Sequence, residues 1–443
     1  MIVAFMRVSA LKYRILSLVT TLTMLIILLM PFHAFLTVWG ASLIGHYTAL
    51  RLWKEVLLLA CIIGVLYLLI TDGKIRSHTL TRRLAWLILV YVAVNVIWGA
   101  VAWHQHTLTI KALGYGLIVN LRFLIFFLIT WSLALRTSRL RKSWQWLVLA
   151  PAAVVVLFGL LQALVLPQDF LSHFGYGPNT IAPFETINHN AQYLRIASTL
   201  RGANPLGAYL LIPISLLAGL LITGRRTWPY VSLFIGSLLT LFFSFSRSAW
   251  IGAALALTVI GIHYLDSKYL KQALAVAACV IVLAATAFAT FEWHHNSRFQ
   301  NIFFHTQTHS AVKTTSDQGH VAGLKDGLHD IIHQPFGRGP GSAGPASVYN
   351  IGSPRIAENY FLQIGQETGW VGLVLFLLIN IGVGYILWLN RQDPLALTLF
   401  ASLIGLTFIS LFSHAWTDDT TAYIWWGLAG IAMVLPNKKT ARP

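Results

Sequence analysis

Apolar runs long enough to cross a lipid bilayer recur along almost the whole chain. A helix needs about 20 residues to cross about 30 Å of hydrocarbon. Because no water reaches the backbone there, each run must satisfy its own hydrogen bonds as a helix. We therefore expect an all-α polytopic membrane protein with about twelve transmembrane helices. The runs are residues 15–38, 53–71, 84–103, 113–135, 145–166, 204–223, 228–244, 249–264, 272–291, 370–390, 394–413 and 420–435.

The composition agrees with this class, since 57% of the residues are hydrophobic and only 10% are charged. A net charge of +17 would suggest a nucleic-acid partner in a soluble protein. In a membrane protein it indicates basic cytoplasmic loops, so no nucleic-acid partner is expected. Cys61 and Cys279 both lie in apolar runs, which excludes a disulfide framework or a metal cluster built from cysteines. The first run is too long for a signal-peptide core and predicts an uncleaved span.

The basic residues predict the orientation. Most of the 31 Lys and Arg residues fall into short loops on one side if both termini are cytoplasmic. This places a large polar loop outside the cytoplasm, between spans nine and ten. We expect one membrane domain, 1–443, that carries an extracytoplasmic helical subdomain at 292–369. A second polar stretch, 167–203, lies on the same side.

Four arginines are candidates for binding an anionic substrate. Arg195, Arg201 and Arg247 are expected at the outer membrane surface, where guanidinium groups fork onto diphosphate oxygens. Phospholipid headgroups are the alternative partners for these three side chains. Arg122 lies within the fourth span, where a charge usually faces the bundle interior. The alternative for Arg122 is a side chain that snorkels to the outer interface.

The outer loop holds the other candidates. Apolar residues at helical spacing predict an amphipathic helix over 318–334, resting on the membrane or on the bundle. His329 and His333 share a helix face, but a solvated polar face is favoured over a zinc site. A short helix beginning at Glu358 and Asn359 should break at Gly369. Glu358 is either a general base with a raised pKa or a helix-terminal carboxylate, and the sequence leaves both open.

Three motifs in this order resemble the O-antigen ligase and O-antigen polymerase superfamily of bacterial envelope glycosyltransferases. They are the segment from Arg195 to Asn-Pro-Leu-Gly207, the turn Phe243-Ser-Phe-Ser-Arg-Ser-Ala249, and Pro335-Phe-Gly-Arg-Gly-Pro-Gly341 followed by Glu358-Asn-Tyr-Phe-Leu-Gln and Glu367-Thr-Gly369. The specific match covers about Arg195 to Gly369, and the rest agrees in hydropathy and topology. Glu358 stands where the family usually has His, which weakens the assignment to a ligase and favours a polymerase or another acceptor.

The resemblance implies a metal-independent inverting glycosyltransferase in the bacterial cytoplasmic membrane, with its active site facing outward. The implied donor is an undecaprenyl-diphosphate-linked glycan, and the acceptor is a hydroxyl of a glycan or glycolipid. Arg195 and Arg247, with Arg201, would hold the diphosphate, and Glu358 with Asn359 would form the catalytic pair. No cofactor is implied. The alternative function is a transporter or a flippase for lipid-linked glycans, which would carry several ionisable residues near the bilayer midplane.

Overall fold

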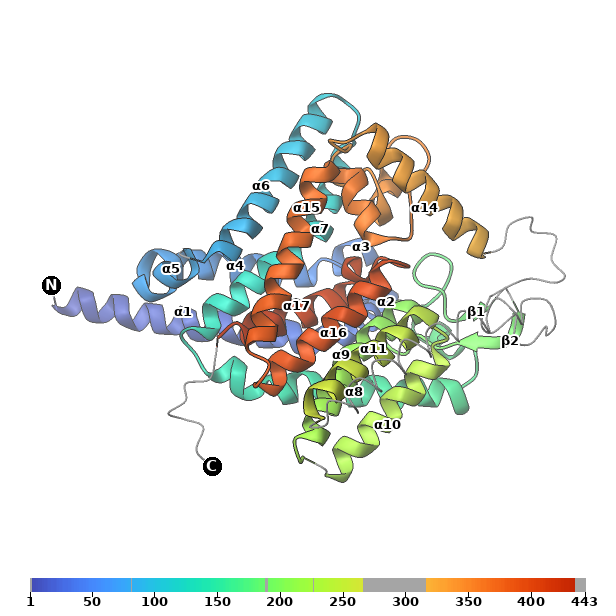
Figure 1. The fold of residues 1–443 in the computed structure, drawn as a ribbon, viewed down its shortest axis with the longest axis horizontal. Coiled ribbons are helices and arrows are strands. Elements are labelled where there is room, and N and C mark those ends of the chain that lie inside the picture. Colours follow the sequence, from blue (N-terminus) through green and yellow to red (C-terminus); the bar gives the residue numbers. More distant parts are fainter. Residues whose placement is uncertain (1, 81, 188–189, 226, 266–315, 435–443) are drawn as a thin grey trace.

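The computed structural model describes residues 2–80, 82–187, 190–225, 227–265 and 316–434. In this part of the chain the protein is mostly helical, with one two-stranded antiparallel sheet (Figure 1). The elements are α1 (Ile2–Leu29), η1 (Met30–Phe32), α2 (His33–Ile44), α3 (Tyr47–Leu50), α4 (Trp53–Thr71), α5 (Gly73–Leu80), α6 (Arg83–His104), α7 (Ile110–Ala134), α8 (Arg139–Leu164), η2 (Phe170–Phe174), β1 (Glu185–Ile187), β2 (Asn190–Arg195), α9 (Ala203–Ile222), α10 (Trp228–Phe243), α11 (Arg247–Tyr264), α14 (Ser316–His333), η5 (Gly344–Tyr349), α15 (Tyr360–Leu389), α16 (Pro394–Ser410), η6 (Ala415–Thr417) and α17 (Asp419–Ala432).

Seven helical segments among the described residues are long and apolar enough to cross a membrane. Two shorter apolar helices, α10 and α16, join them. A multi-pass membrane protein is thus confirmed, whereas the expected count of twelve spans stays a prediction. The expected ninth span, 272–291, lies outside the described residues. The seven segments are Ala10–Ile44, Tyr47–Thr71, Arg83–His104, Ile110–Ala134, Arg139–Leu164, Ala203–Ile222 and Tyr360–Leu389.

Glycines set how closely the central helices approach one another. A Cβ added to Gly430 of α17 would collide with Thr130 of α7, and one added to Gly252 of α11 would lie 2.9 Å from the carbonyl oxygen of Gly405 in α16. Small residues at such crossings allow the backbone contact that drives helix association in lipid. α7, α17, α11 and α16 therefore form a tightly packed centre, which holds the buried Trp416, Trp425 and Trp426.

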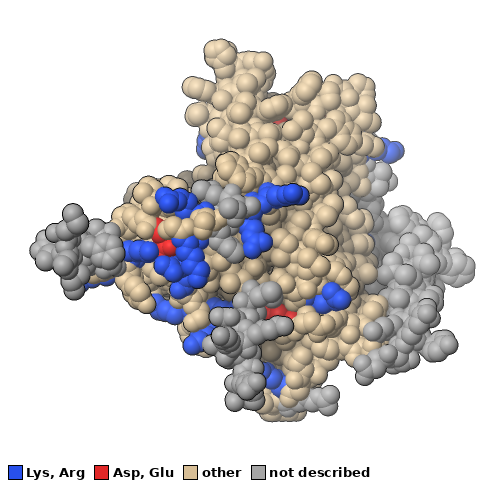
Figure 2. Space-filling view, turned by 60° about the vertical axis from the view of Figure 1, so that its left-hand side comes forward, with Lys and Arg blue, Asp and Glu red and all other residues tan. Residues whose placement is uncertain are grey.

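One end of the bundle is fixed by a buried carboxylate. Asp72, directly after α4, accepts hydrogen bonds from Lys12 at 2.8 Å and from Arg136 at 2.7 Å. Burial alone would raise the pKa of Asp72, but these hydrogen bonds outweigh it and hold the pKa below its ordinary value. Figure 2 shows Lys and Arg side chains gathered on the face that comes forward from the N-terminal end of Figure 1. Such a basic end is typical of the cytoplasmic side, and the orientation stays a prediction.

The expected amphipathic helix is present as α14 (Ser316–His333) and lies against the start of α15. Gly327 faces Leu362 and Ala357, and the buried Ile331 packs on Gly365. The sequence left two surfaces open for this helix, the membrane and the helix bundle. The side of α14 that carries Gly327 and Ile331 packs on the bundle. Leu328 and Ile332, on another side of the same helix, are 50% and 58% exposed.

Candidate functional site

A β-hairpin positions Arg195 at the opposite end of the bundle from Asp72. In the register of β1 and β2, Arg195 lies across from Glu185, and their charged groups are 3.5 Å apart. The Arg195 guanidinium also donates to the Ser244 carbonyl at 3.1 Å and to the Asn204 side chain at 2.6 Å. Because Asn204 lies in the first turn of α9 and Ser244 directly follows α10, Arg195 links the hairpin to the start of one helix and the end of the next.

Arg247 belongs to the same group. It begins α11 directly after the turn that contains Ser244, and Phe245 in that turn has a left-handed φ of 49°. Burial lowers the pKa of the Arg195 guanidinium, Glu185 opposes this, and the nearby charge of Arg247 lowers the pKa further. Arg195, 11% exposed, is bonded to Ser244 three residues before Arg247, so an anion between the two arginines would be bound by both.

Arg201 follows Arg195 by six residues, and its side chain contacts Asp418. It is 49% exposed, and its Nε is 3.7 Å from a carboxylate oxygen of Asp418, the residue that caps α17. Burial raises the pKa of Asp418, while Arg201 acts in the opposite direction. Arg201 therefore reaches solvent and is held by the loop between α16 and α17.

Arg122 is buried in the bundle and does not snorkel to the surface. It is 5% exposed, pairs with Asp419 and with Glu55, and donates to the Thr417 carbonyl at 2.8 Å. Lys54, 3% exposed, adds a second cation at 3.1 Å from Asp419. The interior-facing alternative is confirmed, and the guanidinium is already surrounded by protein acceptors.

His33 completes the network around Asp419. The Trp53 indole N–H donates to His33 Nδ1 at 3.0 Å, and His33 Nε2 lies 3.2 Å from an Asp419 oxygen. An indole nitrogen is only a donor, so Nδ1 is an acceptor and the ring proton lies on Nε2, toward the carboxylate.

Glu358 and Asn359 stand directly before α15. The helix begins at Tyr360 rather than at Glu358, because the Asn359 side chain caps it by accepting from the Leu362 N–H at 3.0 Å. The Asn359 amide also donates to the Leu411 carbonyl, after the end of α16, at 3.0 Å. Glu358 has a left-handed φ of 50°, a strained conformation for a residue with a Cβ.

The same level of the bundle holds both Arg247 and Glu358. α11 and α16 run antiparallel through the Gly252–Gly405 contact, so the start of α11 lies level with the end of α16. Arg247 begins α11, and Leu411 follows α16 and holds Asn359. The candidate base and the candidate diphosphate ligands therefore face the same end of the molecule.

Glu367, which the sequence analysis placed only in a motif, fixes the glycine-rich turn to α15. The helix kinks at Gly369, whose φ is 65°, as expected from the sequence. The glycine-rich turn supplies partners for the backbone groups that the kink leaves without helical hydrogen bonds. The Arg338 N–H donates to the Gln366 carbonyl, and the Trp370 N–H donates to the Pro335 carbonyl, both at 3.0 Å. The fully buried Glu367 side chain accepts from Gly341 N–H at 2.9 Å and from Asn120.

Most described residues on the polar side of α14 are exposed, as expected of a solvated face, and Asp330 is the partly buried one among them. Asp330 accepts from Arg355 at 3.1 Å, from Gln366 at 2.8 Å and from Arg338 at 3.2 Å, which ties α14 to the turn and to α15. His329 and His333 do face solvent, with their rings stacked 3.9 Å apart.

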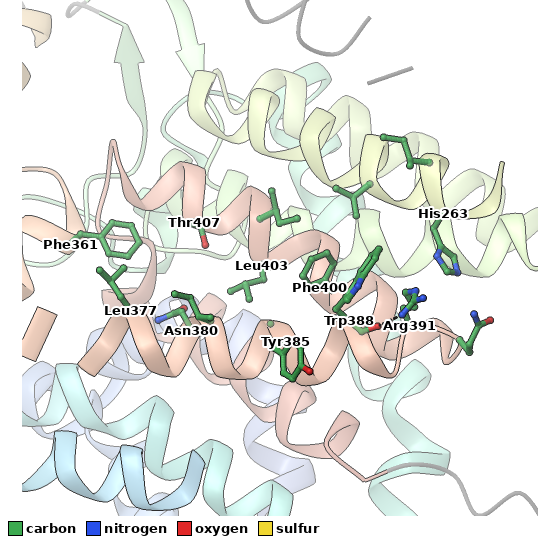
Figure 3. A pocket seen from close by; sticks show the side chains of 16 residues that line it. His263, Phe361, Leu377, Asn380, Tyr385, Trp388, Arg391, Phe400, Leu403 and Thr407 are labelled. Atoms are coloured by element: carbon green, nitrogen blue, oxygen red, sulfur yellow. Dashed lines mark hydrogen bonds between the residues drawn. The ribbon is translucent and has the colours of Figure 1, made fainter. Parts of the chain in front are cut away.

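An apolar groove of about 1000 Å³ runs between α11, α15 and α16. Figure 3 shows Phe361 and Leu377 toward one end and Trp388, Arg391 and His263 toward the other. Phe361 is the second residue of α15, close to Glu358 and Asn359 in the chain. One end of the groove therefore begins beside the candidate catalytic residues.

Comparison of the sequence with models of protein families tests the resemblance noted above. The family described as O-Antigen ligase matches residues 232–377. This match confirms the relation to the O-antigen ligase and polymerase superfamily. The matched residues include Arg247, Glu358, Asn359 and Glu367, while Arg122, Arg195 and Arg201 precede them. No curated protein matches the chain.

The superfamily match indicates a membrane enzyme that transfers glycans in polysaccharide biosynthesis. Nothing in that match favours the transporter alternative. The roles of single residues are not tested by it and stay predictions.

Proposed function

We propose that the protein transfers a glycan from undecaprenyl diphosphate to a hydroxyl of a glycan or glycolipid on the outer face of the cytoplasmic membrane. The observation that carries this proposal is the hydrogen bond from Arg195 to the Ser244 carbonyl, in the turn three residues before Arg247, which brings two arginines from separate segments to one place. The superfamily match supports the reaction class. The proposal makes the enzyme of the O-antigen ligase or polymerase type.

In the proposed reaction, an acceptor hydroxyl attacks the anomeric carbon and inverts it. The new glycosidic bond forms as the bond to the diphosphate oxygen breaks, and Glu358 takes the hydroxyl proton. Arg195 and Arg247 stabilise the charge that grows on the leaving diphosphate. Undecaprenyl diphosphate departs as an anion, so the leaving group needs no proton from the protein.

Arg201 and Arg122 differ in their proposed roles. Arg201 is half exposed and can reach a phosphate oxygen from the side of Asp418. Arg122 is enclosed by Asp419, Glu55 and Thr417. We assign Arg122 to positioning, because it holds the start of α17 and thereby Asp418, the partner of Arg201.

The apolar groove suits the isoprenoid tail of the donor. It begins near Phe361, beside the proposed base, and continues along α15 and α16 toward Trp388. A hydrocarbon chain placed there would leave its diphosphate at the end where Glu358 and Arg247 lie. Close packing against the groove walls would hold the tail, because moving it from lipid into an apolar groove gains no hydrophobic free energy.

The test is release of undecaprenyl diphosphate from a lipid-linked glycan by the purified protein in nanodiscs, with and without an acceptor glycan. We expect release that depends on the acceptor and a product that carries the inverted linkage. Movement of intact donor across a bilayer without release would contradict the proposal and favour the flippase alternative.

A further inference from the structure

A group of aromatic and basic side chains at the outer ends of α4 and α7 has no part in the mechanism above. It comprises Tyr47 of α3, Arg51 after it, Lys111 and Tyr115 of α7, and Tyr349 of η5. We call these five residues the tyrosine cluster. Segments from three parts of the chain build it, so it is a product of the fold and not of one local motif.

The cations of the tyrosine cluster lie against aromatic rings. Arg51 donates to the Tyr115 hydroxyl at 2.9 Å, with its guanidinium 5.6 Å from the centre of the Tyr115 ring. The Lys111 ammonium is 4.3 Å from the centre of the Tyr349 ring. The two rings meet edge to face at 5.4 Å. Each cation is thus attracted to the face of a ring.

The positive charge of the tyrosine cluster is not balanced by carboxylates. Within the described part of the chain, neither Arg51 nor Lys111 forms an ion pair. Arg122, Arg195 and Arg201 each have a carboxylate partner. Uncompensated cations focus a positive potential, which attracts an anion.

The tyrosine cluster is partly exposed and is tied together by hydrogen bonds. Lys111 is exposed, and the rings of Tyr115 and Tyr349 are partly exposed. Thr109 caps α7 and donates to the Tyr349 carbonyl at 2.7 Å, which fixes η5 to the start of the helix. Lys54 donates to the Arg51 carbonyl at 2.8 Å and pairs with Asp419, and Arg201 pairs with the adjacent Asp418. The cluster therefore borders the proposed diphosphate site without belonging to it.

From this geometry we infer that the tyrosine cluster binds the acceptor, through a sugar that carries a phosphate or a carboxylate. The inference rests on the proposed function, since it assigns the second substrate of that reaction. Arg51 and Lys111 would take the anionic group, and the exposed ring faces would pack against the C–H face of the sugar. The border with Arg201 would direct the acceptor hydroxyl toward the donor.

The first test measures binding to the full chain in nanodiscs of zwitterionic lipid, by saturation-transfer NMR with mannose 6-phosphate and mannose. We expect the phosphorylated sugar to bind about fivefold more tightly, the size of a partly exposed charge interaction. Arg51→Gln/Lys111→Gln should remove this preference, and Arg51→Lys, which keeps the charge, should retain part of it. Equal binding of the two sugars by the wild type, or an unchanged double variant, would overturn the inference.

The second test assigns the substrate. In the transfer assay, Arg51→Gln/Lys111→Gln should raise the KM of a phosphorylated acceptor about fivefold and leave kcat and the donor KM unchanged. Arg247→Lys provides the contrast, since it should lower kcat and still bind mannose 6-phosphate. A raised donor KM in the double variant would overturn the acceptor assignment. Wild-type protein that binds the phosphorylated sugar but transfers no glycan would refute the proposed function and leave the anion site standing.

Discussion

Arg122 and Asp419 form an ion pair between α7 and the first residue of α17, and each also contacts a further charge. The pair lies beside Lys54 and Glu55 in the first turn of α4. Without Arg122, the carboxylates of Asp419 and Glu55 are left to share Lys54, so negative charge exceeds positive charge in this largely enclosed group.

We expect Arg122→Met to lower the free energy of unfolding by about 3–5 kcal/mol, the cost of breaking a buried pair. The matched control is Arg139→Met, because Arg139 lies at the exposed start of α8 and should change stability little. Denaturant unfolding in detergent measures both. The double variant Arg122→Met/Asp419→Leu should lose less than the two single losses together, and strict additivity would mean that the pair is not coupled.

Arg247→Lys should lose most of its turnover although it keeps the charge, because an ammonium group cannot form the forked contact with phosphate. Loss of one such donor costs on the order of 3 kcal/mol, or about a hundredfold in rate. Single-turnover transfer with normally folded protein is the measurement. A rate near that of the wild type would show that Arg247 supplies only surface charge.

Glu358→Gln should lower turnover by roughly 10²–10⁴ with donor binding unchanged, because the amide cannot accept the proton of the acceptor hydroxyl. Glu358→His, the residue usual in the family, should keep measurable activity since imidazole titrates near neutral pH.

Rates of all three proteins across pH decide the role of Glu358. If the carboxylate only supported the start of α15, its loss would cost about 0.3–1 kcal/mol of stability and little rate. A Gln variant as fast as the wild type would remove Glu358 from the mechanism, and His329 and His333 would become the candidates for the base.

Gly341→Ala should destabilise the protein by about 1–3 kcal/mol more than Gly352→Ala. Both glycines have a left-handed φ, 93° and 88°, so both variants carry the same kind of backbone strain. A Cβ on Gly341 would collide with the Ala112 carbonyl, whereas nothing lies within 4 Å of one on Gly352. The difference in thermal stability isolates the contact between the turn and α7. Equal losses would show that the contact is loose.

The orientation predicts the behaviour of reporter fusions. A reporter that is active only outside the cytoplasm should be active after Gly352 or His309 and silent after Arg139 or Lys268. The reason is that the short basic loops resist translocation. Activity after Arg139 would reverse the orientation and, with it, the side on which the proposed chemistry occurs.

Much of the helical framework could be predicted from the sequence, because spanning length and hydropathy are local properties. The helix over 318–334, expected from apolar residues at helical spacing, and the break expected at Gly369 are both confirmed. The start of α15 was placed one or two residues too early, since a capping Asn reads like a first helical residue.

The composition of the site was harder to predict, because it depends on contacts between distant segments. The hairpin that places Glu185 opposite Arg195 has strands of 3 and 6 residues. Strands this short give too few residues for an alternating apolar and polar pattern to show in the sequence. The role of Glu367 depends on Asn120 in another helix, and only its place in the Glu-Thr-Gly motif marked it. The partners of Arg122 lie on α4 and α17, which no local periodicity connects.

The Gly252–Gly405 contact also sets how far apart α11 and α16 lie at the proposed reaction centre. Arg247 is carried by one of these helices, and Asn359, which stands next to Glu358, is anchored to the end of the other. The spacing between Arg247, the proposed diphosphate ligand, and Glu358, the proposed base, thus depends on two residues without side chains, Gly252 and Gly405. A methyl group added at Gly405 would collide with the Gly252 carbonyl and push the two helices apart. We expect the wider spacing to slow the proposed transfer, although the methyl group contacts neither substrate.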